Sequence, residues 1–230
     1  MDILKQMYMW PSILNAPIHA LLCQCFPQAL WNGNSDRREI VLTFDDGPDP
    51  SDTPQILEIL AHQQVPATFF HVGKRVAKYP ELVRQVAEAG HQVGMHGYRH
   101  RAFPLEHSAT LHSHLIHTQF LIAQACQRDP ATINLVRPPY GLFLPSTLQV
   151  LVKWGYRPVM WSVVPYHWMQ PAQATIRQVQ QQVTNGSLLV LHEGLSGPSV
   201  LTFVEPIIVY LKGAGFQFIT VDQVEPPPLL

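Results

Sequence analysis

Short apolar runs alternate with longer amphipathic segments from Glu39 to the end of the chain. Short runs rich in branched residues are typical of buried strands, whereas apolar positions three and four residues apart indicate helices. The pattern predicts strands at residues 40–44, 67–70, 92–95, 134–136, 159–163, 188–191 and 217–221. We therefore expect an α/β fold in which parallel strands alternate with helices.

The amphipathic segments between these runs have recognisable ends. Thr53 before Pro54 predicts a helix cap, and Gly90 suits the left-handed residue that often closes a helix. The pattern predicts helices at residues 54–64, 80–90, 108–126, 146–153, 172–183 and 200–212. An incomplete barrel and an open doubly wound sheet both fit this order, and both place their chemistry at the carboxyl ends of the strands.

The length of 230 residues, with 47% hydrophobic and 13% charged residues, is enough for a single large core. Residues 1–36 are apolar, but Pro11 and Pro17 interrupt them and no cleavage site is clear. We expect these residues to form an N-terminal extension that packs on a main domain at residues 37–230. An uncleaved export or membrane-surface segment is the alternative. No stretch is long and clean enough to predict a transmembrane helix.

Charge and motif content exclude several function classes. The formal net charge of -1 gives no reason to expect nucleic acid as a partner, or an anionic membrane surface. The chain's 3 cysteines cannot form a closed disulfide framework. No glycine-rich fingerprint follows the first strand, and no Ser or Cys lies in a nucleophile elbow, so a dinucleotide enzyme and a metal-free hydrolase are both disfavoured.

Polar residues capable of chemistry follow most of the predicted strands directly. Carboxylates follow the first strand, imidazoles the third and sixth, and a guanidinium and a phenol the fourth. These residues are Asp45, Asp46, His96, His100, Arg137, Tyr140 and His192. Because the carboxyl ends of parallel strands meet at one edge, we expect these side chains to lie close together.

His96 and His100 are spaced four residues apart, so in a helical turn both imidazoles would project from one face and could meet one metal ion. A catalytic site of this kind needs a third ligand, which either Asp45 or Asp46 could supply. The other aspartate would then be available as a general base. Adjacent side chains at a strand end diverge, which is a physical reason for two adjacent acids.

Three further residues could support such chemistry. Arg137 is the natural partner for a buried carboxylate and would lower its pKa. His192 could donate a proton to a leaving group. The prolines of "RPPYG" stiffen the backbone, so that an N–H near Tyr140 could point at a developing oxyanion.

The ordered motifs "TFDDGPD", "H-x-x-x-H", "RPPYG", "W-S-V-x-P-x-x-W" and "L-L-V-L-H-E-G" resemble those of the polysaccharide deacetylase family, carbohydrate esterase family four. The resemblance covers residues 39–224. It implies a distorted (β/α) barrel with about seven parallel strands and a catalytic domain at residues 37–230. It also implies a divalent metal, usually zinc, with cobalt, nickel and manganese as alternatives.

The activity implied by the resemblance is removal of acetyl groups from an acetylated glycan, N-acetyl more than O-acetyl. Substrates of this family usually lie outside the cytoplasm, which favours an extracytoplasmic or cell-envelope location. The sequence does not indicate the oligomeric state. Carried over by position, the resemblance implies Asp45 as the base, His192 as the acid and Arg137 as the residue that orients Asp45. The implied metal ligands are Asp46, His96 and His100. The backbone N–H of Tyr140 would bind the oxyanion, and the substrate would contact Trp168, Val190, Pro138 and His167.

Two positions depart from the family pattern in a way that matters. The family has acids in "D-x-x-D-W", one of which helps to hold the catalytic histidine charged, whereas this chain has Val164 and His167. Without a carboxylate partner His192 should favour its neutral form, so we expect an altered pH optimum or substrate preference. A carbohydrate-binding protein that retains the barrel without turnover is the alternative function. Gly97, where Ser or Thr is common, and Val190, in place of Leu, are smaller departures.

Overall fold

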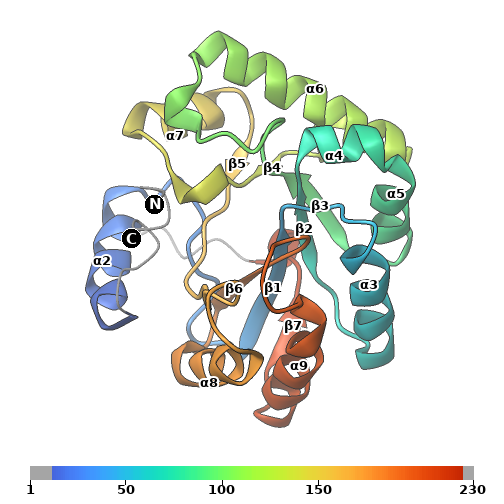
Figure 1. The fold of residues 1–230 in the computed structure, drawn as a ribbon. Coiled ribbons are helices and arrows are strands. Elements are labelled where there is room, and N and C mark those ends of the chain that lie inside the picture. The colour runs from blue at the N-terminus through green and yellow to red at the C-terminus, as the bar shows by residue number, and fades with distance from the viewer. Residues whose placement is uncertain (1–11, 225–230) are drawn as a thin grey trace.

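A curled parallel sheet runs through the centre of the molecule, and the computed structural model describes residues 12–224 (Figure 1). The strand order is β5-β4-β3-β2-β1-β6, and β7 pairs with β1. The strands are β1 Glu39–Asp45, β2 Thr68–His71, β3 Gln92–Met95, β4 Leu135–Val136, β5 Arg157–Pro158, β6 Ser187–His192 and β7 Gln217–Ile219. This order confirms the predicted parallel α/β sheet.

β1 is the central strand, and its residues explain that position. Six consecutive side chains, from Ile40 to Asp45, are buried, as expected for a parallel strand covered on both faces. β6 pairs along the whole of residues 40–45, while β2 and β7 pair with opposite halves of the other edge. Phe44 stacks on Phe69 of β2, with ring centroids 5.0 Å apart. The end of this rigid strand carries the Asp45–Asp46 pair.

The position of the fifth predicted strand needs a correction. The structure places β5 at Arg157–Pro158 instead of residues 159–163, because the chain then leaves β4 and crosses toward β6. Val163 bridges Leu189 of β6, and the Val190 N–H donates to the Val163 carbonyl at 2.9 Å. These contacts bring the two edges of the sheet together. The fold is therefore the distorted barrel rather than the open doubly wound sheet.

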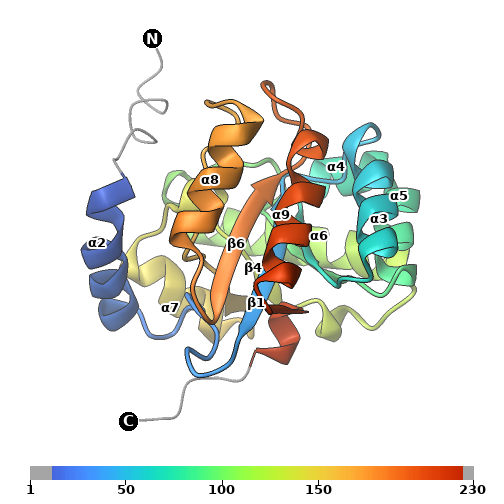
Figure 2. The same cartoon turned by 90° about the horizontal axis from the view of Figure 1, so that it is seen from below.

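Helices surround the sheet on its outer side. Figure 1 shows α3 to α6 along one side, while Figure 2 shows α8 and α9 in front of β6 and β1. The helices are α2 Ser12–Cys25, α3 Asp52–Gln63, α4 Gly73–Lys78, α5 Pro80–Glu88, α6 Ser108–Cys126, α7 Pro145–Lys153, α8 Ala172–Gln182 and α9 Val204–Gly213. The short helix α4 was not predicted, and the predicted helix at residues 200–212 is divided into a 3-10 turn, Val200–Thr202, and α9. None of the helices within residues 12–224 is both long and apolar enough to cross a membrane.

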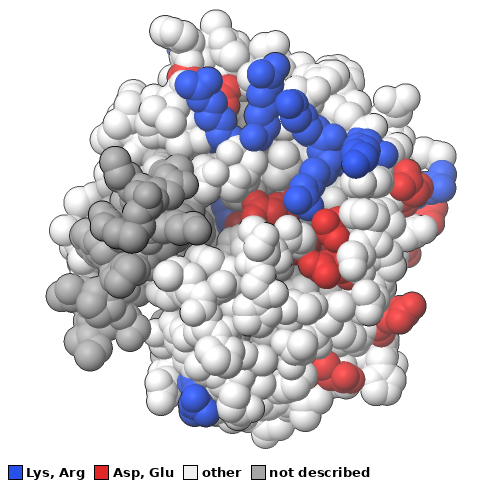
Figure 3. Space-filling view, in the orientation of Figure 1, with Lys and Arg blue, Asp and Glu red and all other residues white. Residues whose placement is uncertain are grey.

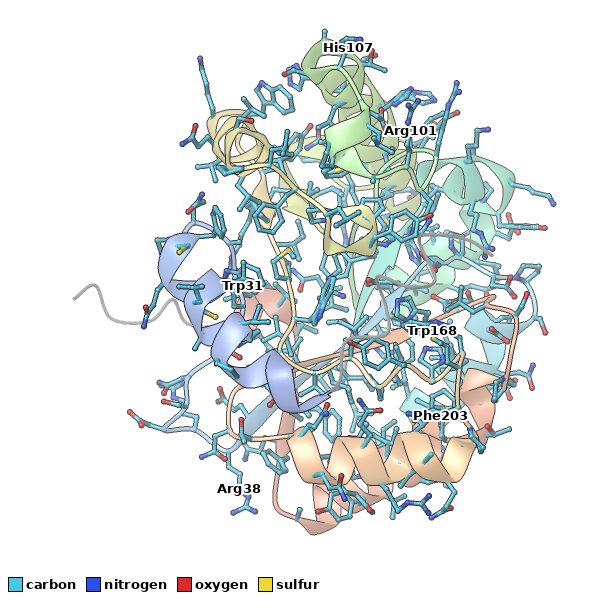
Figure 4. The ribbon with its side chains drawn as sticks, turned by 60° about the vertical axis from the view of Figure 1, so that its left-hand side comes forward. Trp31, Arg38, Arg101, His107, Trp168 and Phe203 are labelled. Atoms are coloured by element: carbon cyan, nitrogen blue, oxygen red, sulfur yellow. The ribbon has the colours of Figure 1, made fainter. Side chains whose placement is uncertain are left out.

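The segment before β1 contacts the barrel through α2 and the residues after it. Leu22 and Phe26 pack against the core, and Trp31 is buried beneath α2 (Figure 4). The indole N–H of Trp31 donates to the Phe26 carbonyl at 3.0 Å, and Nε2 of His19 lies 3.0 Å from the Trp161 carbonyl. Residues 1–11 of the expected extension, which are also the start of the candidate export segment, lie outside the described residues.

Candidate metal centre and catalytic site

The parallel register brings the predicted site residues to one edge of the sheet. Asp45 at the end of β1 is the register partner of His192 at the end of β6. Met95 pairs with Val136, so the next residues along both strands, His96 and Arg137, are also neighbours. Side chains that are up to 147 residues apart in sequence therefore share one edge, as the strand pattern predicted.

Asp46, His96 and His100 form a cluster in which one donor atom of each lies within 4.8 Å of the others. Nε2 of His100 is 2.9 Å from Oδ1 of Asp46, and Nε2 of His96 is 3.5 Å from the same oxygen. Oxygen and imidazole donors of this kind are the set that zinc prefers in catalytic sites. The third member of this cluster is Asp46 and not Asp45. Oδ2 of Asp45 lies 3.8 Å from His96 Nε2.

The expected helical turn between His96 and His100 is not present. Gly97 and His100 both have left-handed backbone angles, with φ of 71° and 52°, so this segment loops instead of coiling. A Cβ at Gly97 would also lie 3.2 Å from the Phe103 ring. Glycine adopts this conformation without strain, so Gly97 suits the loop. The loop still brings both imidazoles onto Asp46.

The contacts of His96 show that the cluster fits a cation. Its Nδ1 lies 2.8 Å from the Arg137 carbonyl, which can only accept, so Nδ1 carries the proton and the Nε2 lone pair faces the carboxylates. Burial lowers the pKa of His96 to about 4, which leaves the ring neutral near pH 7. Oδ1 of Asp46 is buried and accepts no hydrogen bond of good geometry within residues 12–224. A lone pair and an orphaned carboxylate oxygen that face each other are stabilised by a divalent cation between them.

Burial opposes the ionisation of Asp46. Its hydrogen-bonding contact with His100, together with the attraction of His192, His100 and His96 when these rings are protonated in acid, outweighs burial and lowers the pKa of this carboxyl below its usual range. Asp46 is therefore a carboxylate near neutral pH. It also has a left-handed backbone, with φ of 72°. That angle is uncommon for a side chain of this type outside tight turns, and it directs Asp46 away from the course of β1.

Asp45 is held by a network around Arg137, which is fully buried. Nη1 of Arg137 donates to Oδ1 of Asp45 at 2.6 Å and to the Thr43 hydroxyl at 2.7 Å. Nη2 and Nε donate to the carbonyls of Met160 and Val159. Burial lowers the pKa of Arg137 and Asp45 opposes that shift. The guanidinium thus leaves one carboxylate oxygen of Asp45, Oδ2, directed toward His96.

His192 lies against His167 instead of a carboxylate. Nδ1 of His192 is 3.1 Å from Nε2 of His167, and the backbone N–H of His192 donates to the same Nε2 at 3.1 Å. Burial lowers the pKa of His167 to about 3, so this ring is neutral and Nε2 offers a lone pair. Burial also lowers the pKa of His192, against the raising effect of Asp46 and Asp45.

The remaining predicted residues line the edges of this cluster. The Tyr140 ring is 4.6 Å from the His100 ring between centroids, and its backbone is left-handed with φ of 61°. Trp168 meets His192 edge-on at 4.9 Å, and Val190 is buried two residues before His192 on β6. Pro138 is buried, and its carbonyl accepts the Gly141 N–H at 3.0 Å.

Phe203 completes the packing around His167. Figure 4 shows Phe203 on the segment below Trp168, and the ring of Phe203 lies 5.1 Å from that of His167. No motif in the sequence marked this residue. It is part of the apolar surroundings that keep His167 neutral.

Glu193 is a site neighbour that the sequence interpretation missed. Its side chain is fully buried, its backbone N–H donates to the Asp45 carbonyl, and burial raises its pKa to about 8. The Thr53 hydroxyl donates to Glu193, so Thr53 is not the predicted helix cap, a place that Ser51 takes. A Cβ at Gly47 would overlap the Glu193 carboxyl, which explains the glycine after the two aspartates. The only signal for Glu193 was its place directly after His192.

Comparison with known proteins identifies the family. The family model described as polysaccharide deacetylase matches residues 32–159. A curated chitooligosaccharide deacetylase from Bradyrhizobium is 35% identical over 70% of this chain and 73% of its own length. A curated peptidoglycan-N-acetylglucosamine deacetylase from Bacillus cereus is 30% identical over 84% of this chain and 91% of its own length.

A solved structure extends the likeness to the fold. The crystal structure of a peptidoglycan N-acetylglucosamine deacetylase superposes with a TM-score of 0.81 at 28% identity, covering 86% of this chain and 92% of the other. The barrel, the polar strand ends and these relatives agree, and the chain belongs to the polysaccharide deacetylase family.

Proposed function

We propose that this protein is a metal-dependent hydrolase that removes acetyl groups, N-acetyl in preference to O-acetyl, from a glycan of the cell envelope. The single observation that carries the proposal is the position of the Asp46–His96–His100 cluster, directly beside Asp45 and His192. Relatives named as chitooligosaccharide and peptidoglycan deacetylases support the substrate class. An extracytoplasmic location follows from such a substrate.

Asp46, His96 and His100 would hold a divalent ion, with zinc as the first choice for this donor set. Such an ion polarises a carbonyl and lowers the pKa of a water molecule beside it. Asp45 is the base that takes the water's proton, because Arg137 occupies one of its oxygens and the other faces the cluster. Arg137 keeps Asp45 oriented and charge-balanced through the reaction.

His192 then delivers a proton to the leaving nitrogen. Nδ1 of His192 faces the lone pair on Nε2 of His167. The proton that His192 transfers must therefore be the one on its own Nε2. The backbone N–H of Tyr140 stabilises the oxyanion in this proposal, in the left-handed turn beside His100. In this proposal Trp168 and Val190 line the pocket for the acetyl methyl group, and Pro138 and His167 also contact the substrate.

One observation favours a second candidate, a carbohydrate-binding protein without turnover. Val164 and His167 replace both acids of the family's "D-x-x-D-W" motif, and the pKa of His192 is lowered. A binder needs no protonated acid at this position. It would still hold the metal and an acetylated glycan.

Acetate release from N-acetylated chito-oligosaccharides and from an O-acetyl ester separates the two functions. The chain would be loaded with zinc or cobalt, its metal content measured, and the assay repeated after removal of the metal with a chelator. The proposal expects acetate from the N-acetyl substrate that disappears on chelation and returns with metal. No turnover with one metal bound per chain would support the binder.

A further inference from the structure

The face beside the metal cluster carries a concentration of positive charge that the net charge of the chain conceals. Five of the 15 Lys and Arg residues lie in two short segments, residues 73–78 and 97–105, that contain no Asp or Glu. We call these five residues the cationic rim: Lys74, Arg75, Lys78, Arg99 and Arg101. Figure 3 shows Lys and Arg side chains gathered over this part of the molecule, next to acidic side chains at the centre of the face.

Backbone hydrogen bonds hold the two segments together. The Gly73 N–H donates to the Gly97 carbonyl, and the Lys74 N–H donates to the Tyr98 carbonyl, both at 2.9 Å. α4 therefore starts beside the loop that carries His100. Arg99 and Arg101 flank this metal-cluster residue in the sequence. The rim is thus fixed to the site by the backbone rather than by flexible side chains.

Arg75 is the member of the rim that reaches furthest into the site. Its Nη1 is 3.2 Å from Oδ2 of Asp49, three residues after Asp46. A Cβ at Gly194 would lie 2.7 Å from the same nitrogen, so the guanidinium lies against the loop that follows His192. The rim consequently extends from the outer surface to two segments of the site. One carries the expected metal ligand Asp46 and the other carries the expected acid His192.

The rest of the rim has no acidic partner to balance it. Lys74, Lys78, Arg99 and Arg101 are exposed, and none of them forms an ion pair with any residue in the described range 12–224. Lys78 instead lies over the Tyr79 ring at 4.8 Å. Figure 4 shows Arg101 on the loop ahead of α6, at the surface. Unpaired charges of one sign that line one side of a site attract ligands of the opposite sign and increase their rate of association.

We infer that the substrate is an acidic glycan, whose carboxylate or phosphate groups bind the cationic rim while the acetylated sugar occupies the metal cluster. This inference deepens the proposed function and rests on it. Arginine binds both kinds of anion with paired hydrogen bonds, so the rim fits either group. A neutral chito-oligosaccharide would occupy the cluster but leave the rim without a partner.

The test compares three acetylated oligosaccharides of equal length: one neutral, one with carboxylates on neighbouring sugars and one with phosphates there. For the wild type, kcat/KM is expected to be about tenfold higher for at least one acidic substrate. That preference should disappear as the salt concentration is raised to about 1 M, where charges further than about 3 Å apart are screened. Equal kcat/KM values for all three substrates, with no salt dependence, would overturn the inference.

A pair of matched variants locates the effect. The triple variant Lys74→Gln/Arg99→Gln/Arg101→Gln is expected to lose the ratio of acidic to neutral kcat/KM. The control Lys153→Gln/Arg128→Gln/Arg177→Gln removes the same charge from exposed positions on α7, after α6 and on α8, and should retain that ratio. Loss of the ratio in both variants would contradict a role for the rim.

Failure of the proposed function would be visible separately. Acetate release from the neutral substrate tests the hydrolase, whereas the acidic-to-neutral ratio tests the rim. If none of the three is turned over, calorimetric affinities of the wild type for the same oligosaccharides replace the rates. Tighter binding of an acidic one supports the inference; equal affinities, or binding of anionic lipid vesicles without any preference among the glycans, would overturn it.

Discussion

Nε2 of His167 lies 3.1 Å from Nδ1 of His192 and accepts the backbone N–H of His192 at the same distance. A neutral imidazole therefore stands where the family pattern has an acid. A carboxylate would favour the charged form of His192, whereas a neutral ring supplies only a lone pair. The proton that the proposed acid must deliver is held less firmly here than it would be beside a carboxylate.

Replacing His167 with Asp should move the pH dependence of turnover. A carboxylate at this position raises the pKa of His192, and activity that needs protonated His192 is lost when the pH rises above that pKa. The alkaline limb of kcat/KM against pH should therefore shift upward by about 1–2 pH units in His167→Asp. The exposed His107 provides the control, because His107→Asp should leave the profile unchanged. Identical profiles for wild type and His167→Asp would exclude this role for His167.

Arg137 should be essential to both stability and turnover, because removing it leaves Asp45 charged and buried without a partner. Breaking a buried pair in this way costs about 3–5 kcal/mol. Arg137→Met is expected to lower the urea midpoint accordingly and to abolish acetate release. Arg84→Met breaks only an exposed 3.9 Å contact with Glu88 and should cost less than about 1 kcal/mol. Equal midpoints for the two variants would be inconsistent with the network described around Asp45.

His71 should make the fold less stable in acid. It is fully buried, and neither ring nitrogen makes a hydrogen bond of good geometry within residues 12–224. Burial lowers its pKa to about 3, against a smaller raising effect of the Gly47 backbone. The unfolded chain binds this proton below about pH 6.5 and the folded chain does not, so stability falls as the pH drops from 6.5 toward 3. Between pH 7 and pH 5 His71 lowers the free energy of unfolding by about 2 kcal/mol.

Urea unfolding at the two pH values measures this contribution. His71→Leu should reduce the loss of unfolding free energy between pH 7 and pH 5 by that amount, whereas His107→Leu, at an exposed position, should not change it. If His71→Leu and the wild type lost the same unfolding free energy between pH 7 and pH 5, His71 would not be the group that destabilises the fold in acid.

The hydrophobic pattern was sufficient to predict the parallel α/β sheet and the meeting of the site residues, because β1 is a buried run that ends in two acids. Because parallel strands end at the same edge of the sheet, His192 and Arg137, which follow later strands, were expected beside these acids, and the strand order agrees. The choice of the barrel over the open sheet came from the resemblance to the deacetylase family. Residue spacing was less reliable within loops. His96 and His100 match a helical interval, but the left-handed angles of Gly97 and His100 come from tertiary packing that no local pattern reveals.

Features that join distant segments were not predictable. Thr53 looked like a helix cap by its position before a proline, yet its hydroxyl binds Glu193, 140 residues away. The cationic rim also needs the hydrogen bonds between Gly73 and Gly97 to bring its two segments together. Composition alone indicated a chain without a basic surface, because a net charge averages over faces that differ.

The division of labour between Asp45 and Asp46 is tested most directly by measuring bound zinc and acetate release together in Asp46→Ala and Asp45→Asn. Asp46→Ala removes a cluster ligand and is expected to lose zinc and turnover together. Asp45→Asn retains the three-residue cluster and is expected to keep one zinc per chain while kcat falls by about 10²–10⁴-fold. If both variants kept their zinc and released acetate like the wild type, the two aspartates would be no more than a polar turn at the end of β1.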